Sequence, residues 1–215
     1  MKIGIINSGF SNIASVQNAL NEININSELI NSNNSSYDLI IMPGIGNFGY
    51  AMDSMRNSFV FDMISNHNQN QKPIIGICLG MQLLFESSDE SPSANGFGFL
   101  DGHFEKLAIP KKENSNGRKP PNIGYNNVNF QNNAGIKSLN DLNISNGFYY
   151  FLHSYALKNP QKSYQVSASS SFNGKEFTPF LIQDNICAIQ FHPERSGING
   201  LNLFSLIINY FRWNI

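Results

Sequence analysis

Charged residues are scarce in this sequence. Lys, Arg, Asp and Glu make up 13% of its 215 residues, about half the share that is usual in soluble proteins. Asparagine and serine fill the deficit and crowd residues 21–36 and 131–146, where loops are expected. The formal net charge is −1 and there is no basic stripe, which excludes the electrostatic footprint of a nucleic-acid-binding protein. We therefore expect no nucleic-acid partner.

Long apolar runs and a disulfide framework are also missing. No run approaches the roughly 18 to 20 apolar residues that a membrane span needs, and the first residues, MKIGIINSGF, have too short an apolar core for a signal peptide. The two cysteines, Cys78 and Cys187, are too few to staple a chain of this size. These absences predict a cytoplasmic protein without a membrane partner.

The first half of the chain alternates between strand-like and helix-like segments. We predict buried strands at residues 2–6, 37–44 and 72–77, and helices at residues 13–20, about 51–64 and 81–86. The strands are apolar on both faces, which is typical of a parallel sheet covered by helices on both sides.

The second half has a different rhythm. Short candidate strands at residues 102–108, 126–130, 148–157, 163–170, 177–183 and 186–191 are separated by turns and precede a helix at residues 201–211, while residues 110–121 read as a surface loop. We therefore predict one α/β domain over residues 1–215, with a mostly parallel central sheet, helices on both faces and an antiparallel extension.

The first candidate functional residue is Cys78, which lies between two glycines in GICLG, after a predicted strand and before a predicted helix. A free cysteine is often a buried, inert residue. The pattern GxCxG also matches a nucleophile elbow, a sharp turn that exposes a reactive side chain at a helix start. There the helix dipole favours the thiolate and the next amide can stabilise an oxyanion. On this stretch alone, both interpretations stand.

Two other strand ends carry matching chemistry. In CAIQFHPERS, His192 follows an apolar strand and Glu194 comes two residues later, so a carboxylate can approach the imidazole and orient it as a base. In PGIG, glycines on both sides of Ile45 leave backbone amides free to face a bound carbonyl. Each motif alone also fits a surface histidine or a plain turn. Because ligands bind at the carboxyl ends of parallel strands, the three together indicate one site.

These motifs resemble the class I, or triad, glutamine amidotransferases, in which PGIGNFG, GICLGMQLLFE and QFHPE occur in this order. The resemblance extends over nearly the whole chain and implies a flavodoxin-like sandwich. It implies that Cys78 is the nucleophile, His192 the general base and then acid, and Glu194 the residue that orients His192. By the same resemblance, Ile45 and Leu79 supply oxyanion-hole amides, and glutamine is held by Gly46, Gln82, Glu90, Ser154 and Tyr155. No metal or organic cofactor is implied.

Within this family, NFGYAM, GYNNV and FLHSY resemble glutaminase subunits that form a heterodimer with a (β/α)8-barrel cyclase of histidine biosynthesis. Such a partner receives ammonia through a tunnel. The resemblance places five residues on the docking face: Phe10, Asn12, Tyr125, Asn126 and Arg195.

The sequence departs from the usual pattern on the side that meets the partner. Ser11 replaces a glycine, Asn122 and Tyr125 replace the histidine and tryptophan of PHMGWN, and Arg195 replaces a lysine. Paralogues of this glutaminase supply ammonia to synthases of bacterial surface sugars, and FLDG at residues 99–102 is suggestive of them. A free-standing γ-glutamyl hydrolase and a catalytically silent binding subunit are further alternatives.

Overall fold

A computed structural model of the protein describes residues 1–7, 12–32, 36–109, 118–132, 144–158 and 164–214. It contains a nine-stranded sheet in the order β2-β1-β3-β4-β12-β11-β10-β7-β8 and a three-stranded sheet in the order β5-β6-β9. The predicted turn at residues 8–11 and residues 110–117 of the predicted loop lie outside the described residues.

One half of the large sheet is parallel. It consists of β2 (Glu28–Ile30), β1 (Ile3–Ile6), β3 (Leu39–Gly44), β4 (Ile74–Cys78) and β12 (Ile186–Ile189). Every residue of β1, β3, β4 and β12 is buried, because helices cover both faces of this half. The carboxyl ends of β3, β4 and β12 lie side by side.

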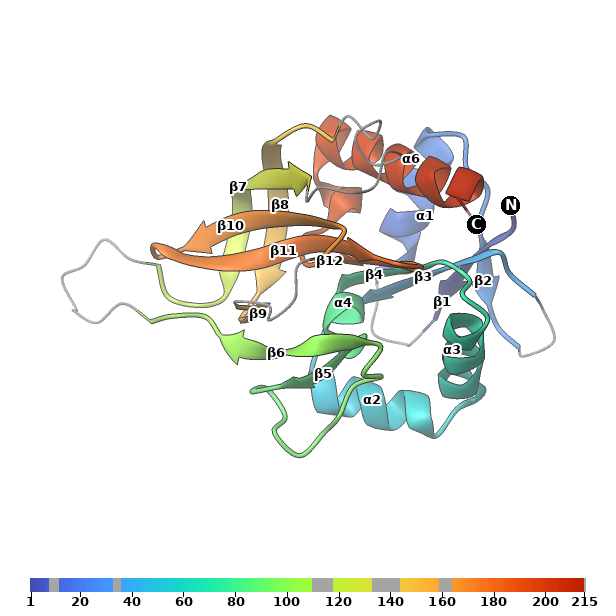
Figure 1. The fold of residues 1–215 in the computed structure, drawn as a ribbon, viewed down its shortest axis with the longest axis horizontal. Coiled ribbons are helices and arrows are strands. Elements are labelled where there is room, and N and C mark those ends of the chain that lie inside the picture. Colours follow the sequence, from blue (N-terminus) through green and yellow to red (C-terminus); the bar gives the residue numbers. More distant parts are fainter. Residues whose placement is uncertain (8–11, 33–35, 110–117, 133–143, 159–163, 215) are drawn as a thin grey trace.

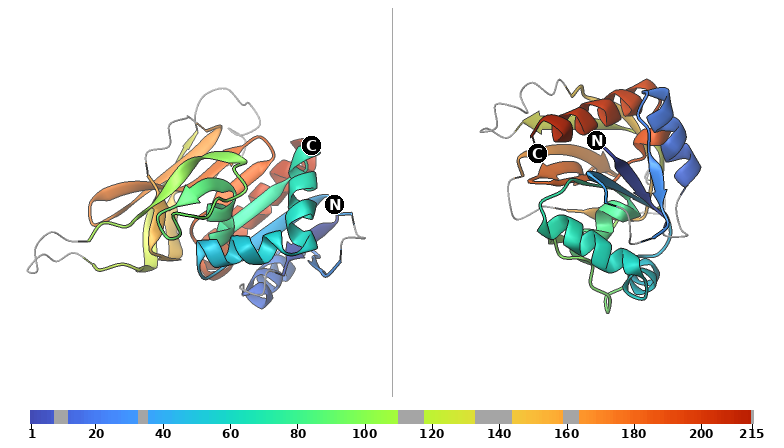
Figure 2. Two further views of the ribbon diagram at one scale, coloured as in Figure 1. Left: turned by 90° about the horizontal axis from the view of Figure 1, so that it is seen from below. Right: turned by 90° about the vertical axis from the view of Figure 1, so that its right-hand side faces the viewer.

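The other half is the antiparallel extension seen projecting from the sandwich in Figures 1 and 2. It consists of β11 (Lys175–Gln183), β10 (Val166–Phe172), β7 (Asn122–Asn132) and β8 (Gly147–His153). The small sheet contains β5 (Phe85–Ser88), β6 (Leu100–Lys106) and β9 (Tyr155–Leu157). The predicted fold class is thus confirmed, with a large mixed sheet.

Helices form the outer layers. Figure 1 and the right view of Figure 2 show α1 (Ile13–Glu22) and α6 (Gly197–Asn214) on one face of the parallel strands, and α2 (Phe48–Arg56) and α3 (Phe59–Gln69) on the other. Apolar residues at helical spacing, such as Val16 and Leu20 of α1, pack into one of two cores that flank the sheet. The sandwich holds the strand ends in fixed positions.

Two predicted helices were wrong in extent. The helix expected at about 51–64 is two helices, because Asn57 ends α2 and Ser58 caps α3 by accepting a hydrogen bond from Val60 N. The helix expected at 81–86 is the single turn α4 (Leu79–Leu83), after which the chain enters β5. Phe85 packs edge-to-face on Phe104 of β6, so tertiary packing overrides the local helical preference.

Other elements were missed or extended. Strand β2 lies in the asparagine-rich segment that was expected to be a loop, and it pairs with β1. The C-terminal helix is longer than the predicted 201–211 at both ends. Among the described residues, no helix is long and apolar enough to cross a membrane.

Candidate active site

The three motif-bearing strand ends meet at one edge of the sheet. Gly44 at the end of β3 pairs with Cys78 at the end of β4, and β12 runs along the other side of β4 toward His192. Residues separated by more than a hundred positions are therefore neighbours. This placement follows from the strand order β3-β4-β12.

Cys78 is at a strained turn between β4 and α4. Its backbone has φ 54° and ψ −109°, a conformation that residues other than glycine rarely adopt. The flanking glycines explain how the turn fits: a Cβ at Gly80 would overlap the carbonyl oxygen of Met42 in β3, and one at Gly76 would lie 2.7 Å from the oxygen of Gly80. The pattern GxCxG is therefore needed for close packing, while Cys78 itself carries the unusual φ.

The thiol of Cys78 has two polar neighbours. Its Sγ lies 3.6 Å from the carbonyl oxygen of Leu152, to which it donates, and Gln190 Nε2 lies 3.8 Å from the sulfur. Gln190 is fully buried and its Oε1 accepts a hydrogen bond from Gln82 Nε2 at 3.2 Å. An amide–amide link thus connects the nucleophile candidate to a residue of the predicted glutamine site.

His192 and Glu194 form a buried pair next to Cys78. His192 Nδ1 lies 2.7 Å from Glu194 Oε1, and their side chains are 6% and 3% exposed. Within the described part of the chain, His192 Nε2 has no hydrogen-bond partner and so is free to exchange a proton with the thiol. Burial alone would lower the pKa of His192, but interaction with Cys78 in its thiolate form, followed by the hydrogen bond and charge of Glu194, outweighs burial and raises this pKa to about 10.

The turn that carries His192 is fixed to β8. The His192 amide donates to the carbonyl of Tyr150 at 2.8 Å, while Ser196 Oγ donates to the His192 carbonyl and accepts from the Tyr150 amide. The short helix η1 (Pro193–Arg195) then turns Glu194 back toward the imidazole. His192 and Glu194, the expected base and its orienting carboxylate, are therefore held by contacts of their backbone.

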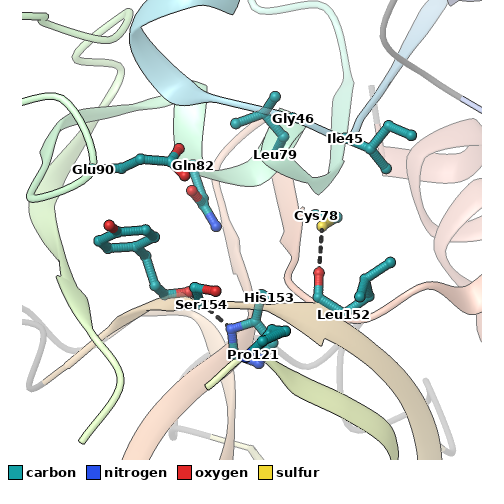
Figure 3. A pocket seen from close by; sticks show the side chains of 11 residues that line it. Ile45, Gly46, Cys78, Leu79, Gln82, Glu90, Pro121, Leu152, His153 and Ser154 are labelled. Atoms are coloured by element: carbon teal, nitrogen blue, oxygen red, sulfur yellow. Dashed lines mark hydrogen bonds between the residues drawn. The ribbon is translucent and has the colours of Figure 1, made fainter. Parts of the chain in front are cut away.

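A cavity of about 190 Å³ opens beside Cys78. Figure 3 shows Cys78 and Ile45 on one side of it and Glu90 on the opposite side. The cavity is lined by all the residues expected in the oxyanion hole and in the glutamine site, which are Ile45, Gly46, Leu79, Gln82, Glu90, Ser154 and Tyr155. Three further lining residues were not expected: Pro121, Leu152 and His153. Its size, and the few polar side chains set in a mainly apolar lining, suit a single amino acid.

Glu90 anchors the far wall of this cavity. Its Oε2 accepts a hydrogen bond of 2.7 Å from the amide of Phe48 at the start of α2. Burial raises the pKa of Glu90, and the Phe48 amide partly opposes this effect. Burial also raises the pKa of Tyr155, and the negative charge of Glu90 adds to the rise. A carboxylate here can receive the ammonium group of an amino acid.

Some of the expected docking residues lie close to the triad. The Tyr125 hydroxyl donates to the Arg195 carbonyl at 2.9 Å, and the Arg195 guanidinium lies 4.7 Å from the centre of the Tyr150 ring. Asn126 binds Arg118 and Asn122 through its amide, and Asn12 caps α1. Phe10 lies outside the described residues.

Sequence reasoning missed Gln190, Leu152 and His153. Gln190 had a usable signal, since it stands two residues before His192 at the end of a strand and so faces the same way. Leu152 contributes a backbone carbonyl, for which side-chain patterns give no signal. No cluster of residues suited to a metal ion occurs in the described ranges.

Comparisons with known proteins agree with this geometry. The family model described as "Glutamine amidotransferase class-I" matches residues 4–204. The imidazole glycerol phosphate synthase subunit HisH of Thermotoga maritima is 32% identical over 97% of this chain and 96% of its own length. The corresponding subunit of Sulfurimonas denitrificans is 36% identical over 97% of this chain and 98% of its own length.

A solved structure shows the same fold at low sequence identity. The crystal structure of a glutamine amidotransferase superposes with a TM-score of 0.73 at 12% identity, covering 99% of this chain and 100% of that one. Because the family model covers most of the sequence and the relatives align end to end, the chain belongs to the class-I glutamine amidotransferases and is a glutamine-hydrolysing enzyme.

Proposed function

We propose that this chain is the glutaminase subunit of an imidazole glycerol phosphate synthase and that residues 1–215 act as one catalytic domain. The observation that carries the proposal is the meeting of Cys78, the His192–Glu194 pair and an amino-acid-sized cavity at adjacent strand ends. Similarity to HisH subunits over nearly the whole chain supports the choice of synthase.

The first half of the reaction forms a thioester. The Cys78 thiolate attacks the side-chain carboxamide carbon of glutamine, and the amides of Ile45 and Leu79 stabilise the oxyanion. As the C–N bond breaks, His192 gives its proton to the nitrogen, which leaves as ammonia. Glu194 holds the His192 ring in position throughout, as their 2.7 Å contact allows.

The second half releases glutamate. Neutral His192 takes a proton from water, the hydroxide adds to the thioester carbonyl, and the C–S bond breaks to regenerate the Cys78 thiolate. Gly46, Gln82, Glu90, Ser154 and Tyr155 hold the amino-acid end of the substrate, with Glu90 placed for the ammonium group. No step needs a metal or an organic cofactor.

The ammonia passes to a docked (β/α)8-barrel cyclase, which uses it to make imidazole glycerol phosphate and an aminoimidazole carboxamide ribotide. Release into water would lose it as ammonium, so a sealed contact is required. We assign this contact to Asn12, Tyr125, Asn126 and Arg195, together with Phe10.

A synthase of bacterial surface sugars is the second candidate partner. The observation that favours it is the set of departures at Asn122, Tyr125 and Arg195, which lie near or on the proposed docking face. Glutamate release measured with each purified synthase separates the two. The proposal expects strong stimulation by the cyclase and its nucleotide substrate; stimulation by the sugar synthase alone would move the chain to the second assignment.

The catalytic assignment is tested on the cysteines. Cys78→Ala is expected to abolish glutamate release and labelling by a chloroketone analogue of glutamine, whose chloride the thiolate displaces. Cys187→Ala is the matched control, because Cys187 is fully buried in β12 and burial raises its pKa far above the ordinary value. Labelling that survives in Cys78→Ala and disappears in Cys187→Ala would refute the assignment.

A further inference from the structure

A line of hydrogen bonds runs from the surface into the wall of the glutamine cavity. Arg118 Nη2 donates to Asn126 Oδ1 at 2.9 Å, and Asn126 Nδ2 donates to Asn122 Oδ1 at 2.7 Å. Asn122 Nδ2 then meets His153 Nε2 at 3.0 Å, and His153 Nδ1 meets the carbonyl oxygen of Tyr155 at 2.8 Å. Four side chains are thus joined end to end.

The two ends of this line, Arg118 and the Tyr155 carbonyl, together determine which group donates and which accepts in every hydrogen bond. Arg118 can only donate, so Asn126 must present its oxygen to Arg118 and its NH2 group to Asn122. Asn122 therefore accepts with its oxygen and donates with its nitrogen to His153 Nε2. At the other end, the Tyr155 carbonyl can only accept, so His153 must carry its proton on Nδ1. The two requirements select one tautomer of His153.

The backbone explains how these side chains meet. Asn122 of β7 and His153 of β8 are directly paired in register, so their side chains share one face of the sheet. Asn122 and Asn126 would be about 13 Å apart in an extended strand. Gly124 lies between them with φ 111°, and the bend that it permits lets the two amides touch.

The inner hydrogen bonds of this line, those of Asn122 and His153, are shielded from water, so losing one would leave a buried polar group without a partner. Asn122 is fully buried and His153 is 5% exposed. Burial lowers the pKa of His153 to about 4. The hydrogen bond to the Tyr155 carbonyl partly opposes this shift, and the positive charge of His192 lowers the pKa further. His153 is therefore neutral near pH 7, which is the state in which a fixed tautomer has meaning.

The residues beside His153 form one wall of the catalytic cavity. Leu152 presents its carbonyl to Cys78, and Ser154 and Tyr155 line the cavity, as Figure 3 shows for Leu152, His153 and Ser154. The bond from His153 to the Tyr155 carbonyl closes the turn between β8 and β9 on itself. The contacts that fix the orientation of His153 therefore also fix the Ser154–Tyr155 part of the cavity wall.

We infer that Asn122 and His153 are positioning residues for glutamine: Asn122 holds His153 in its Nδ1-protonated form, and His153 holds the Ser154–Tyr155 turn against the substrate. Arg118 and Asn126 set the direction of the line from the surface. The inference rests on the proposed glutamine site and adds to it two residues outside the expected triad and glutamine contacts.

The first experiment measures the tautomer. Long-range ¹H–¹⁵N spectra of the full chain with labelled histidine should show His153 protonated on Nδ1 and bare on Nε2. Asn122→Leu removes one of the two constraints, so the Nε2-protonated form should gain population, while the Tyr155 carbonyl still favours the Nδ1 form. Asn122→Asp should move a proton onto Nε2, because a carboxylate only accepts. A wild-type His153 protonated on Nε2 would overturn the inference.

The second experiment measures glutamine hydrolysis by the same proteins. Asn122→Leu should raise KM for glutamine about fivefold, the scale of one net hydrogen bond, while kcat changes little. Asn122→His should restore KM, because an imidazole can accept from Asn126 with one nitrogen and donate to His153 with the other. An unchanged KM in Asn122→Leu, or a loss of kcat alone, would contradict the positioning role.

A buried asparagine at the opposite end of the sheet provides the control. Asn185 is 6% exposed, and its amide donates to the Lys72 carbonyl and to Asn68. Asn185→Leu should lower the thermal midpoint as Asn122→Leu does but leave KM and the His153 spectrum unchanged. An equal rise of KM in Asn185→Leu would show a general loss of stability. A wild-type chain that hydrolyses no glutamine in the presence of either synthase and its acceptor would refute the proposed function, while the spectra would still test the tautomer.

Discussion

At the scale of single residues, the site depends on a cysteine with an unfavourable backbone and a histidine with an unusual charge state. A non-glycine residue at positive φ costs on the order of 1–3 kcal/mol, and Cys78 adopts φ 54° at the point where β4 becomes α4. The conformation places Sγ between the Leu152 carbonyl and Gln190. Strain at Cys78 is thus tied to the position of the sulfur that we propose as the attacking atom.

Glu194→Gln tests how far the carboxylate matters. The amide keeps the shape of Glu194 but carries no negative charge, so the pKa of His192 should fall and the ring should lose its preferred orientation. We expect kcat for glutamate release to fall by about 100-fold or more. Steady-state kinetics with a coupled glutamate assay measures it.

Glu105→Gln is the control for this change. Glu105 is half-exposed and pairs with Lys158 at the surface, where a salt bridge contributes about 1 kcal/mol or less. The kcat of the Glu105→Gln variant should equal that of the wild type. A Glu194→Gln enzyme that retains full kcat would show that Glu194 has no role in orienting His192.

At the scale of elements, α4 packs so closely on β3 that residue 80 has no room for a side chain. Gly80 packs directly on the Met42 carbonyl, so Gly80→Ala must displace either the helix or the strand. We expect this variant to lower the free energy of unfolding by about 3 kcal/mol or more. Chemical denaturation followed by circular dichroism measures the loss.

Gly44→Ala is the matched comparison at the end of β3. Its added Cβ would lie 3.0 Å from Leu79 Cβ and 3.2 Å from the Gly80 amide, a tight contact that small shifts can relieve. The destabilisation should therefore be clearly smaller than for Gly80→Ala. Equal losses would mean that the Met42 contact is not what demands glycine at residue 80.

Sequence patterns predicted the elements that are buried along their whole length. They failed where contacts with residues distant in sequence determine the secondary structure. The strands ending at Gly44 and Cys78 are apolar throughout and were recognisable. Residues 84–86 look helical in isolation, yet Phe85 is drawn into β5 by its contact with β6. Motifs predicted the expected triad and glutamine residues, and the structure places them around one cavity and beside one another. The Leu152 carbonyl and the line through Asn122 and His153 depend on the β7–β8 register, which no local pattern reports.

At the scale of the whole molecule, two buried histidines link stability to acid pH. Burial lowers the pKa of both His67 and His153 from 6.5 to about 4. Between these values the unfolded chain binds protons that the folded chain excludes. The stability that these residues provide is therefore present above pH 6.5 and is lost as the pH falls toward 4.

His67→Gln isolates one of these contributions. The amide can still donate to the Pro73 carbonyl, which His67 Nε2 contacts at 3.0 Å, but it cannot titrate. Between pH 7.5 and pH 5, the variant should lose less unfolding free energy than the wild type, by up to about 2 kcal/mol. Urea titrations at the two pH values measure the difference, and identical losses would contradict a depressed pKa for His67.

The position of β12 has a consequence for protein synthesis. This strand lies between β4 and β11, so the sheet joins its two halves only through residues 186–189. In a nascent chain that has emerged as far as β10, Cys78 is already outside the ribosome, but the edge of β4 that pairs with β12 is free and the proposed base at residue 192 has not yet emerged. On the proposed catalytic assignment, glutamine hydrolysis therefore begins only after β12 has been inserted, and translation products that stop before it are catalytically silent.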